Sequence, residues 1–440
     1  MKHINLKPKK VHFIGIGGSA LNYLAQILKA YEFEVSGCDL TESENTKLLK
    51  SKNIDLSIGH SSDHITKDLD EVIISSAITE KSPAWSEVEK AKSFKIPIVK
   101  RTAYWQKLMR CGKGIAISGT HGKTTTTAMI GVILQEAGFD PTVMVGGFVP
   151  EFGGTVRIGK LNYIVVEADE YDRAFLSTAP QISVITNIDA DHLDSYPQGL
   201  PEIRQAFKKF IRLLPAKTGI LIAYGKDPNI RQIAKSFDLK YRFYDEDNLW
   251  PGLKLKVPGL HNRLNATAAA RVAHELGVEH KIILKALNNF SGVVRRQEYL
   301  GKIGQAEIFD DYAHLPQEIE ATVRAFREKF LNKKILTVFQ PHQKRRTQEN
   351  LEELSRVLTL SDQSLVAPLY FVAGREDDIE ISSMDIAIAT HDQSSKIIAY
   401  NDWQLFIQKF DELIKSYDIV IIMGAGDLSQ KVKEMYNLTK

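Results

Sequence analysis

Cysteine is scarce in this sequence, which has two, Cys38 and Cys111, among 440 residues. Two distant cysteines provide neither a disulfide framework nor a zinc-type ligand spacing, so we expect both to be small, buried or half-buried residues of a protein from a reducing compartment. An excess of one charge is also lacking, since 57 Lys and Arg against 54 Asp and Glu leave +3. So small a net charge does not predict a nucleic-acid-binding surface.

Long apolar runs are absent as well. No window approaches the roughly 18 apolar residues of a membrane span, and the first ten residues contain no apolar stretch of the signal-peptide kind. We therefore expect a cytoplasmic protein with no membrane partner. Internal repeats and low-complexity tracts are missing too, and the length predicts about three ordinary domains.

The clearest motif is a glycine-rich turn between an apolar strand at 115–117 and an apolar helix that starts at Lys123. The backbone N–H groups of such a turn, with the positive end of a helix, hold a phosphate chain. Lys123 would reach the terminal phosphates, and the Thr124 hydroxyl would be a Mg²⁺ ligand. The pattern therefore predicts a nucleotide site.

The motif departs from the common phosphate-loop pattern, because Ile117 stands where that pattern has its first glycine. A glycine-rich turn before an ordinary helix is the alternative interpretation. The four threonines at 124–127 disfavour it, since β-branched hydroxyl residues are poor residues with which to begin a helix. Nucleotide binding explains them better.

Two later apolar strands each end in a group of acidic residues. The first group is Glu167, Asp169, Glu170 and Asp172, and the second is Asp189, Asp191 and Asp194, with His192 added to it. Either group alone could be a solvated loop. Together, in one domain with a Lys-Thr phosphate loop, they predict a Mg-nucleotide site with room for a second cation. His192 is either a metal ligand, in a site that would also accept Mn²⁺, or a residue that hydrogen-bonds to the ligands without contacting the metal.

The start of the chain has a second glycine-rich turn, with Gly15, Gly17 and Gly18 between an apolar strand and a helix-like run. A further strand ends at Asp39. The arrangement resembles a dinucleotide-binding βαβ unit, in which the glycines admit a diphosphate and the acid faces a ribose or base. Leu21 replaces the third glycine of that fingerprint, so NAD is not expected. A structural turn without a ligand is the alternative.

Additional strands at 71–75 and 96–99 favour a doubly wound sheet in this first domain. Ser75 and Ser76 lie at the carboxyl end of a strand, where open α/β sheets bind ligands. Beyond 291–296, three more apolar strands end in polar or glycine-rich elbows. We therefore predict an α/β protein of three domains, comprising residues 1–108, 109–294 and 295–440.

Several motifs, in the same order and spacing across nearly the whole chain, resemble the Mur ligases of peptidoglycan synthesis. They are residues 119–125, 167–170, 187–194, 261–266 and 311–314. The similarity is greatest to the members that add L-alanine. The segments that carry this finer resemblance are residues 15–19, 75–78, 187–194, 339–342 and 424–427.

The resemblance implies an N-terminal Rossmann-like UDP-binding domain, a central P-loop ATPase-type domain and a C-terminal Rossmann-like domain that binds the amino acid. It also implies an ATP- and Mg²⁺-dependent ligase that joins L-alanine to the lactyl carboxylate of UDP-N-acetylmuramate. The carboxylate would be phosphorylated first, and the amine would then attack the acyl phosphate, so that ADP and phosphate are released.

The resemblance implies roles for single residues. The UDP-sugar ligands would be Gly15, Gly17, Gly18, Ser19, Asp39, Ser75 and Ser76. The nucleotide ligands would be Gly119, Thr120, His121, Gly122, Lys123, Thr124, Thr125, Asn262, Arg296 and Asp311. The metal ligands would be Thr124, Glu167 and His192, and the amino-acid ligands Tyr312, His314, His342 and Arg346. Catalysis would rest on Lys123, His192, His314 and Arg296, with the general base open between His192 and His314.

The chain departs from the family pattern at three positions. Leu315 replaces a histidine, Gln343 an arginine and Gln297 an aromatic residue. The missing arginine would hold the carboxylate of the amino acid, and Lys344 or Arg345 could take its place unless the basic run is an exposed face. These changes concern the accepted amino acid more than the reaction.

Three alternative functions stay open. One is the related recycling ligase, which attaches a whole tripeptide, and another is a folylpolyglutamate-type ligase, which lacks an N-terminal UDP domain. The third is a nucleotide-binding regulatory protein that has lost ligation, which the retention of Lys123, Glu167 and His192 opposes. The oligomeric state is open between monomer and homodimer.

Overall fold

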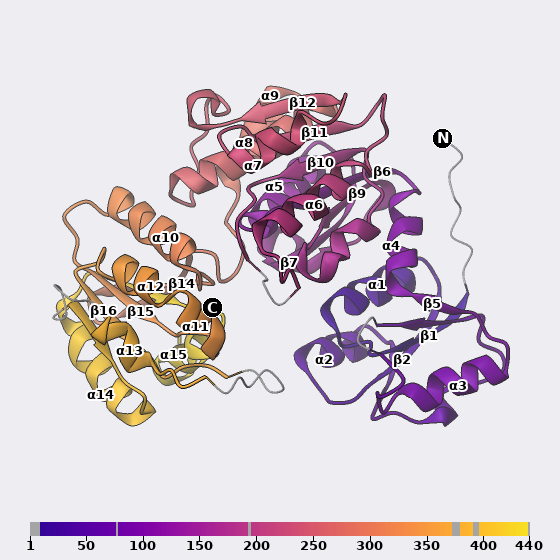
Figure 1. Ribbon diagram of the computed structural model, residues 1–440, viewed down its shortest axis with the longest axis horizontal. Coiled ribbons are helices and arrows are strands. Elements are labelled where there is room, and N and C mark those ends of the chain that lie inside the picture. Colours follow the sequence, from indigo (N-terminus) through magenta and orange to yellow (C-terminus); the bar gives the residue numbers. More distant parts are fainter. Residues whose placement is uncertain (1–8, 76–77, 192–194, 372–378, 390–395, 439–440) are drawn as a thin grey trace. The chain divides into compact units, whose positions relative to one another are not determined.

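The computed structural model describes residues 9–75, 78–191, 195–371, 379–389 and 396–438 (Figure 1). The chain forms two compact units. The first comprises residues 1–148, 152–250 and 266–286, and the second comprises residues 149–151, 251–265 and 287–440. The first unit contains two sheets and the second contains one.

The first sheet has the strand order β3-β2-β1-β4-β5, and all its neighbours are parallel. Its strands are β1 (Lys10–Ile14), β2 (Glu34–Asp39), β3 (Asp55–Ile58), β4 (Glu71–Ile74) and β5 (Ile98–Lys100). The helices are α1 (Ser19–Ala30), α2 (Glu44–Ser51), η1 (Ser62–His64), α3 (Trp85–Ser93) and α4 (Arg101–Met109). Alternate residues of β1 belong to two apolar cores, one with α1 and one with α3, so helices cover both faces.

The second sheet has the order β12-β11-β10-β6-β9-β7-β8. Its strands are β6 (Lys113–Ser118), β7 (Pro141–Val149), β8 (Gly154–Arg157), β9 (Lys160–Glu167), β10 (Ile182–Ile185), β11 (Ile220–Tyr224) and β12 (Lys240–Tyr244). The helices that follow or connect them are α5 (Lys123–Glu136), η2 (Pro150–Phe152), η3 (Tyr171–Ser177), α6 (Leu200–Ile211), α7 (Pro228–Ala234), η4 (Glu246–Asn248), α8 (Leu260–Glu275) and α9 (His280–Asn289). The central strand β6 is parallel to both neighbours, β9 and β10, so the ends of these three strands meet at one edge.

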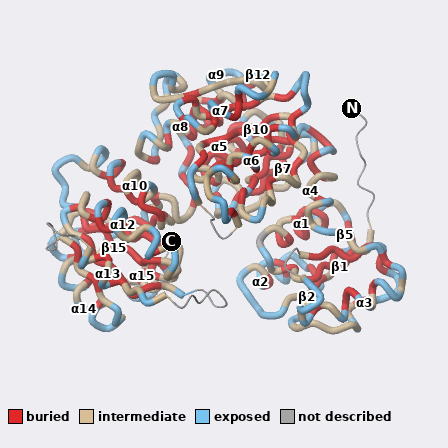
Figure 2. Tube along the Cα trace, in the orientation of Figure 1, coloured by how far each residue is buried: buried red, intermediate tan, exposed pale blue. Residues whose placement is uncertain are grey.

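The third sheet has the order β13-β14-β18-β15-β16-β17, in which only the β13–β14 pair is antiparallel among the strands described. The strands are β13 (Glu298–Ile303), β14 (Ala306–Asp311), β15 (Ile335–Phe339), β16 (Gln363–Val366), β17 (Ile397–Ala399) and β18 (Ile419–Met423). The helices are α10 (Pro316–Lys329), α11 (Lys344–Glu349), α12 (Leu351–Leu358), α13 (Ser383–Ile388), α14 (Trp403–Leu413), η6 (Ile414–Ser416) and α15 (Leu428–Tyr436). Figure 2 shows the buried residues concentrated in the strands and on the helix faces turned toward them.

The α/β class with three mainly parallel sheets is confirmed. The domain boundaries near residues 109 and 295 stay a prediction. Within the described residues, none of the helices combines the length and apolarity that crossing a membrane requires.

Candidate active site

The predicted phosphate loop connects β6 to α5, and its path depends on two glycines. Gly119 has φ +132°, and a Cβ there would lie 2.1 Å from Thr186 Oγ1. Gly122 has φ +82° and directly precedes Lys123, the first residue of α5. Both positions need glycine, one for space and both for backbone conformation. The loop therefore reaches the amino end of α5 at the carboxyl edge of the sheet.

The segment after β10 holds this loop in place. The Asn187 side chain accepts a hydrogen bond from His121 N (2.8 Å) and donates one to His121 O (3.1 Å). Thr186 Oγ1 also donates to His121 O (2.6 Å), and Asp189 N donates to Thr120 Oγ1 (2.9 Å). Thr186 and Asn187 are not among the predicted site residues, although their position just after the end of β10 is a usable signal.

Lys123 carries the charge of the loop. Its Nζ donates to Gly119 O (2.7 Å) and to both carboxylate oxygens of Glu170 (2.9 Å each), and Asp169 lies 3.9 Å away. Burial acts to lower the pKa of Lys123, but the charges of Glu170 and Asp169 outweigh it, so the net pKa is raised. Burial also raises the pKa of Glu170. The loop thus contains a protonated lysine whose charge is balanced by a buried carboxylate.

Thr124 and Glu167 present oxygen atoms beside this lysine. Thr124 Oγ1 donates to Glu167 Oε1 (2.8 Å), while Gly146 N donates to Glu167 Oε2 (2.6 Å) and orients the carboxylate. A hydroxyl and a carboxylate at this separation fit Mg²⁺, which prefers oxygen ligands. The third predicted metal ligand, His192, lies outside the described residues.

The structure thus brings most of the predicted nucleotide and metal residues of the first unit to one turn. They are Gly119, Thr120, His121, Gly122, Lys123, Thr124, Thr125 and Glu167. His121 Nε2 lies 3.6 Å from Asp189 Oδ2, and burial raises the pKa of that carboxyl. Glu170, which was quoted in the acidic motif but not assigned a role, proves to be the partner of Lys123.

The glycine turn of the first sheet lies at the carboxyl ends of β1 and β2. Gly15 has φ +81°, and a Cβ there would lie 3.5 Å from Ser75 Cβ. Gly17 N donates to Asp39 Oδ2 (2.7 Å), so this carboxylate oxygen binds the turn itself rather than pointing away from it. Gly18 precedes α1, which begins at Ser19. Ser76 lies outside the described residues.

In the second unit, Asp311 ends β14 and is 4% exposed. It accepts hydrogen bonds from Gln297 N (3.0 Å) and Ala313 N (2.8 Å). Burial raises the pKa of Asp311 to about 6, against the opposing charge of Arg296. Asn262 Nδ2 donates to Gln297 Oε1 (3.2 Å). Gln297, unexpected by sequence, therefore links Asn262 at the start of α8 to the end of β14.

Three of the residues predicted to bind the amino-acid substrate have aromatic rings that lie near one another. The centroid of His314 lies 5.4 Å from that of Tyr312 and 6.4 Å from that of His342. His314 Nδ1 lies 3.0 Å from Tyr312 O, which favours a proton on Nδ1 and leaves Nε2 as the basic nitrogen. Burial lowers the pKa of His314, and the charge of Arg346 adds to this effect despite the opposing Glu318. His314 is therefore a neutral base near neutral pH.

Two of the residues that depart from the family pattern lie directly before helices in the second unit. Leu315 is buried directly before α10. Gln343 has φ +70° directly before α11, and Arg345 Nε pairs with Glu349 Oε1 at 3.0 Å on an exposed stretch of that helix. Arg345 therefore belongs to an exposed face, whereas Arg346 is half-buried and acts on the pKa of His314.

Three family models match this chain: "Mur ligase family, catalytic domain" at residues 10–112, "Mur ligase middle domain" at 117–250 and "Mur ligase, glutamate ligase domain" at 295–426. A UDP-N-acetylmuramate–L-alanine ligase of Methylobacillus flagellatus is 37% identical over 99% of this chain and 97% of its own. One from Carboxydothermus hydrogenoformans is 37% identical over 96% of this chain and 94% of its own.

Solved structures agree. The crystal structure of a UDP-N-acetylmuramate–alanine ligase from Thermotoga maritima matches with a TM-score of 0.74 and 27% identity, over 98% of this chain and 100% of that one. A murein peptide ligase from Psychrobacter arcticus matches with a TM-score of 0.68 and 22% identity, over 98% of each chain, which supports the fold alone. With its three matched segments, its full-length relatives and its Lys123 phosphate loop, the chain belongs to the Mur ligase family.

Proposed function

We propose that this protein uses ATP to join L-alanine to the lactyl carboxylate of UDP-N-acetylmuramate, a step in peptidoglycan precursor synthesis. One observation supports this most strongly. Lys123, Thr124 and Glu167 meet at the amino end of α5 in a chain 37% identical, over nearly its whole length, to ligases named for that reaction.

Amide formation from a carboxylate is uphill, so the reaction needs an activated acid. The lactyl carboxylate attacks the γ-phosphorus of ATP, which releases ADP and leaves an acyl phosphate. The amine of alanine then attacks the acyl carbon, and the tetrahedral intermediate collapses with loss of phosphate. The protein's main tasks are to neutralise negative charge and to keep water from the acyl phosphate.

The phosphate loop is suited to the first task. The loop N–H groups and the amino end of α5 would face the phosphates, and the Lys123 ammonium would lie beside the transferred group. Since Lys123 is paired with Glu170 in this structure, a γ-phosphate would compete with that carboxylate for the ammonium. Glu170, whose pKa is raised, would then take up a proton or move toward water.

Thr124 and Glu167 would hold the Mg²⁺ that accompanies ATP, with His192 as a further proposed ligand. The ion would screen the charges of the phosphates and of the attacking carboxylate. Gly146 N would keep the Glu167 carboxylate oriented through its hydrogen bond to Oε2. Mn²⁺ would be tolerated if His192 is a ligand.

The second unit would supply the residues for the amino acid. We place the carboxylate of alanine near Arg346, with Tyr312 and His342 beside it. His314 would accept the ammonium proton at Nε2, since its ring is neutral and Nδ1 faces a carbonyl. Asn262, Arg296 and Asp311 would contact the nucleotide, and Gly15, Gly17, Gly18, Ser19, Asp39, Ser75 and Ser76 would hold the UDP sugar.

The proposal is tested by offering the protein several amine substrates in parallel. The full chain is incubated with ATP, Mg²⁺ and UDP-N-acetylmuramate, and L-alanine, glycine, L-serine or the tripeptide L-Ala-γ-D-Glu-meso-diaminopimelate is added in turn. Phosphate release and product mass are followed. We expect coupled phosphate release and a product heavier by one alanyl residue with L-alanine.

The other outcomes contradict the proposal in distinct ways. A product with the tripeptide alone would identify a recycling ligase, and one with another amino acid would trace to the changes at Leu315 and Gln343. Phosphate release without any amine would indicate uncoupled hydrolysis. No phosphate release in any mixture would indicate a nucleotide-binding protein without ligase activity.

A further inference from the structure

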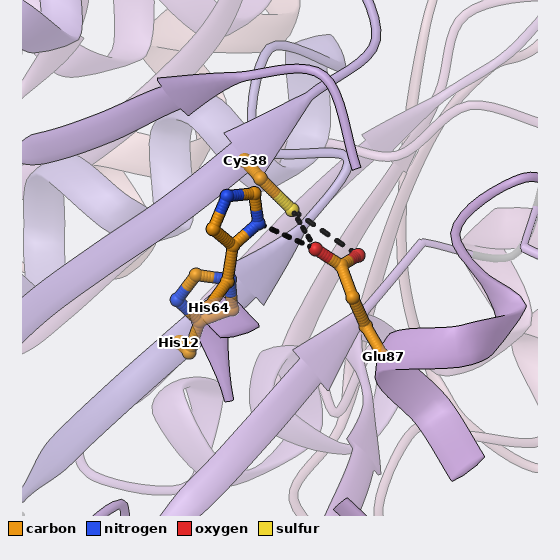
Figure 3. Close-up of side chains that lie close together, drawn as sticks. All are labelled: His12, Cys38, His64 and Glu87. Carbon is orange, nitrogen blue, oxygen red and sulfur yellow. Dashed lines mark hydrogen bonds and ion pairs between the residues drawn. The ribbon is translucent and has the colours of Figure 1, made fainter. Parts of the chain in front are cut away.

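A second group of polar side chains lies inside the first sheet's α3-facing core, apart from the phosphate loop. It comprises His12 of β1, Cys38 of β2, His64 of η1 and Glu87 of α3 (Figure 3). One potential ligand atom from each residue lies within 4.8 Å of the others. The surrounding core is apolar, with Ile14, Val72 and Val88 among its members.

Glu87 is the centre of this group and is fully buried. Its Oε1 lies 2.7 Å from His64 Nδ1 and 3.2 Å from Cys38 Sγ, and its Oε2 lies 3.0 Å from His60 Nδ1. Within the part of the chain that the structure describes, the basic side chains that contact its carboxylate are these two histidines. A carboxylate in an apolar core is costly unless a cation or several hydrogen bonds balance it. Ser61 N also donates to Glu87 Oε1 (3.2 Å), so these hydrogen bonds balance the buried carboxylate, and a cation bound between the ligand atoms would take over that role.

His12 has a free nitrogen in the same core. It is 3% exposed, and its Nδ1 lies 2.9 Å from Ser36 Oγ. Its Nε2 is buried and has no hydrogen-bond partner among the described residues. A neutral imidazole whose Nδ1–H is engaged by a neighbour presents an Nε2 lone pair, which is how a metal-bound histidine is oriented.

We propose that His12, Cys38, His64 and Glu87 bind a divalent transition-metal ion, of which Zn²⁺ is the best match. One thiolate, two imidazoles and one carboxylate form a donor set that suits four-coordinate zinc and does not suit Mg²⁺. The Cys38 thiol loses its proton to solvent when the metal binds. Because four side chains complete the coordination, the role is structural.

Such an ion would connect β1, β2, η1 and α3. Cys38 also accepts backbone hydrogen bonds from Gly15 N (2.9 Å) and Ile16 N (3.0 Å), so the same residue supports the glycine turn proposed for the UDP sugar. His60 Nδ1, 3.4 Å from Cys38 Sγ and 3.0 Å from Glu87 Oε2, would hydrogen-bond the ligating groups. The ion would thus stabilise the edge of the sheet on which that turn rests.

The test is a metal titration of the full chain, stripped with a chelator and kept free of nucleotide. Titration with Co²⁺, a spectroscopic substitute for Zn²⁺, should show about one equivalent bound with tetrahedral d–d bands and a thiolate-to-cobalt charge-transfer band. Cys38→Ser should abolish the charge-transfer band and weaken Zn²⁺ binding at least roughly 10-fold. Cys111→Ser, which changes the other buried cysteine, is the matched control and should retain the band.

The band separates this site from the acidic site of the second sheet, where the predicted ligands include no thiol. Absence of the band in the unmodified chain, or its persistence in Cys38→Ser, would overturn the proposal. If Cys38→Ser fails to fold, the proposal is tested by comparing His64→Gln with the unmodified chain. Zn²⁺ should raise the melting temperature of the unmodified chain much more than that of His64→Gln, and an equal shift would refute the assignment.

Discussion

Lys123 is the residue on which the proposed chemistry depends most, because its ammonium lies in the loop that we propose to bind the phosphates. Lys123→Ala should lower kcat by at least about 100-fold, the usual loss when one electrostatic donor of a transition state is removed. Binding of UDP-N-acetylmuramate, which we propose to occur at the first sheet, should be unchanged when it is measured by calorimetry. Lys209→Ala, on the exposed face of α6, is the control and should retain full activity. Loss of UDP-sugar binding in Lys123→Ala would show that the assignment of the two sites is wrong.

The Thr124 hydroxyl provides a second residue-level test, because two substitutions separate its oxygen from its shape. Thr124→Val keeps the volume and removes the oxygen that donates to Glu167, whereas Thr124→Ser keeps the oxygen. We expect Thr124→Val to raise the Mg²⁺ concentration for half-maximal rate by roughly 10–100-fold. Thr124→Ser should remain close to the unmodified enzyme. Equal metal dependence of the two variants would exclude Thr124 as a metal ligand.

At the scale of elements, the β6–α5 turn depends on Gly119, which packs against the residues that directly follow β10. A Cβ on Gly119 would meet Thr186 Oγ1 at 2.1 Å and Asn187 O at 2.9 Å, in addition to the strain of φ +132°. Gly119→Ala should therefore lower the free energy of unfolding by roughly 2–4 kcal/mol and weaken ATP binding. Gly138→Ala, at φ +75° with no atom within 4 Å of its Cβ, should cost only about 1 kcal/mol. Urea unfolding and nucleotide titration of both variants measure the difference, and similar losses would contradict this account of the turn.

At the scale of the whole molecule, the buried Asp311 makes stability depend on pH. Its pKa of about 6 lies above the ordinary 3.8, so the folded state binds the proton more tightly than the unfolded state. Stability from this group is thus fully present below about pH 4 and is lost as the pH rises to about 6, by about 3 kcal/mol in all. Asp311→Asn, with no proton to lose, should remove this part of the pH dependence.

The effect is measured by urea unfolding at about pH 4 and about pH 7. Unfolding is monitored by hydrogen exchange of amides in the second unit, so that the stabilities of the two units are separated. Asp402→Asn is the matched control, since an asparagine can still accept the hydrogen bond from Leu405 N at the start of α14. That variant should retain the pH dependence of the unmodified chain. A pH dependence unchanged in Asp311→Asn would mean that Asp311 ionises normally.

The sequence alone was enough to predict three α/β regions with their main strands and helices. Each of these elements depends on residues that are neighbours in the sequence. Apolar strands, amphipathic helices and glycines at special backbone angles are local features, and the strand before Gly119 and the helix after Gly122 agree with their prediction. The order of motifs was equally visible. The prediction of a Mur-type ligase followed from that order and is confirmed by full-length relatives.

Contacts between distant residues were decided only by the tertiary structure. In the sequence, Glu167 and Glu170 belong to one acidic motif. In the structure they have different partners, because Thr124 donates a hydrogen bond to Glu167 and Lys123 donates one to Glu170. The fold also places Gln297 within hydrogen-bond distance of Asn262, and Cys38 within hydrogen-bond distance of Glu87, which lies 49 residues later in the sequence. The physical reason is that a charge or a lone pair acts over a few ångströms in space, and sheet order, not sequence spacing, sets which side chains come that close.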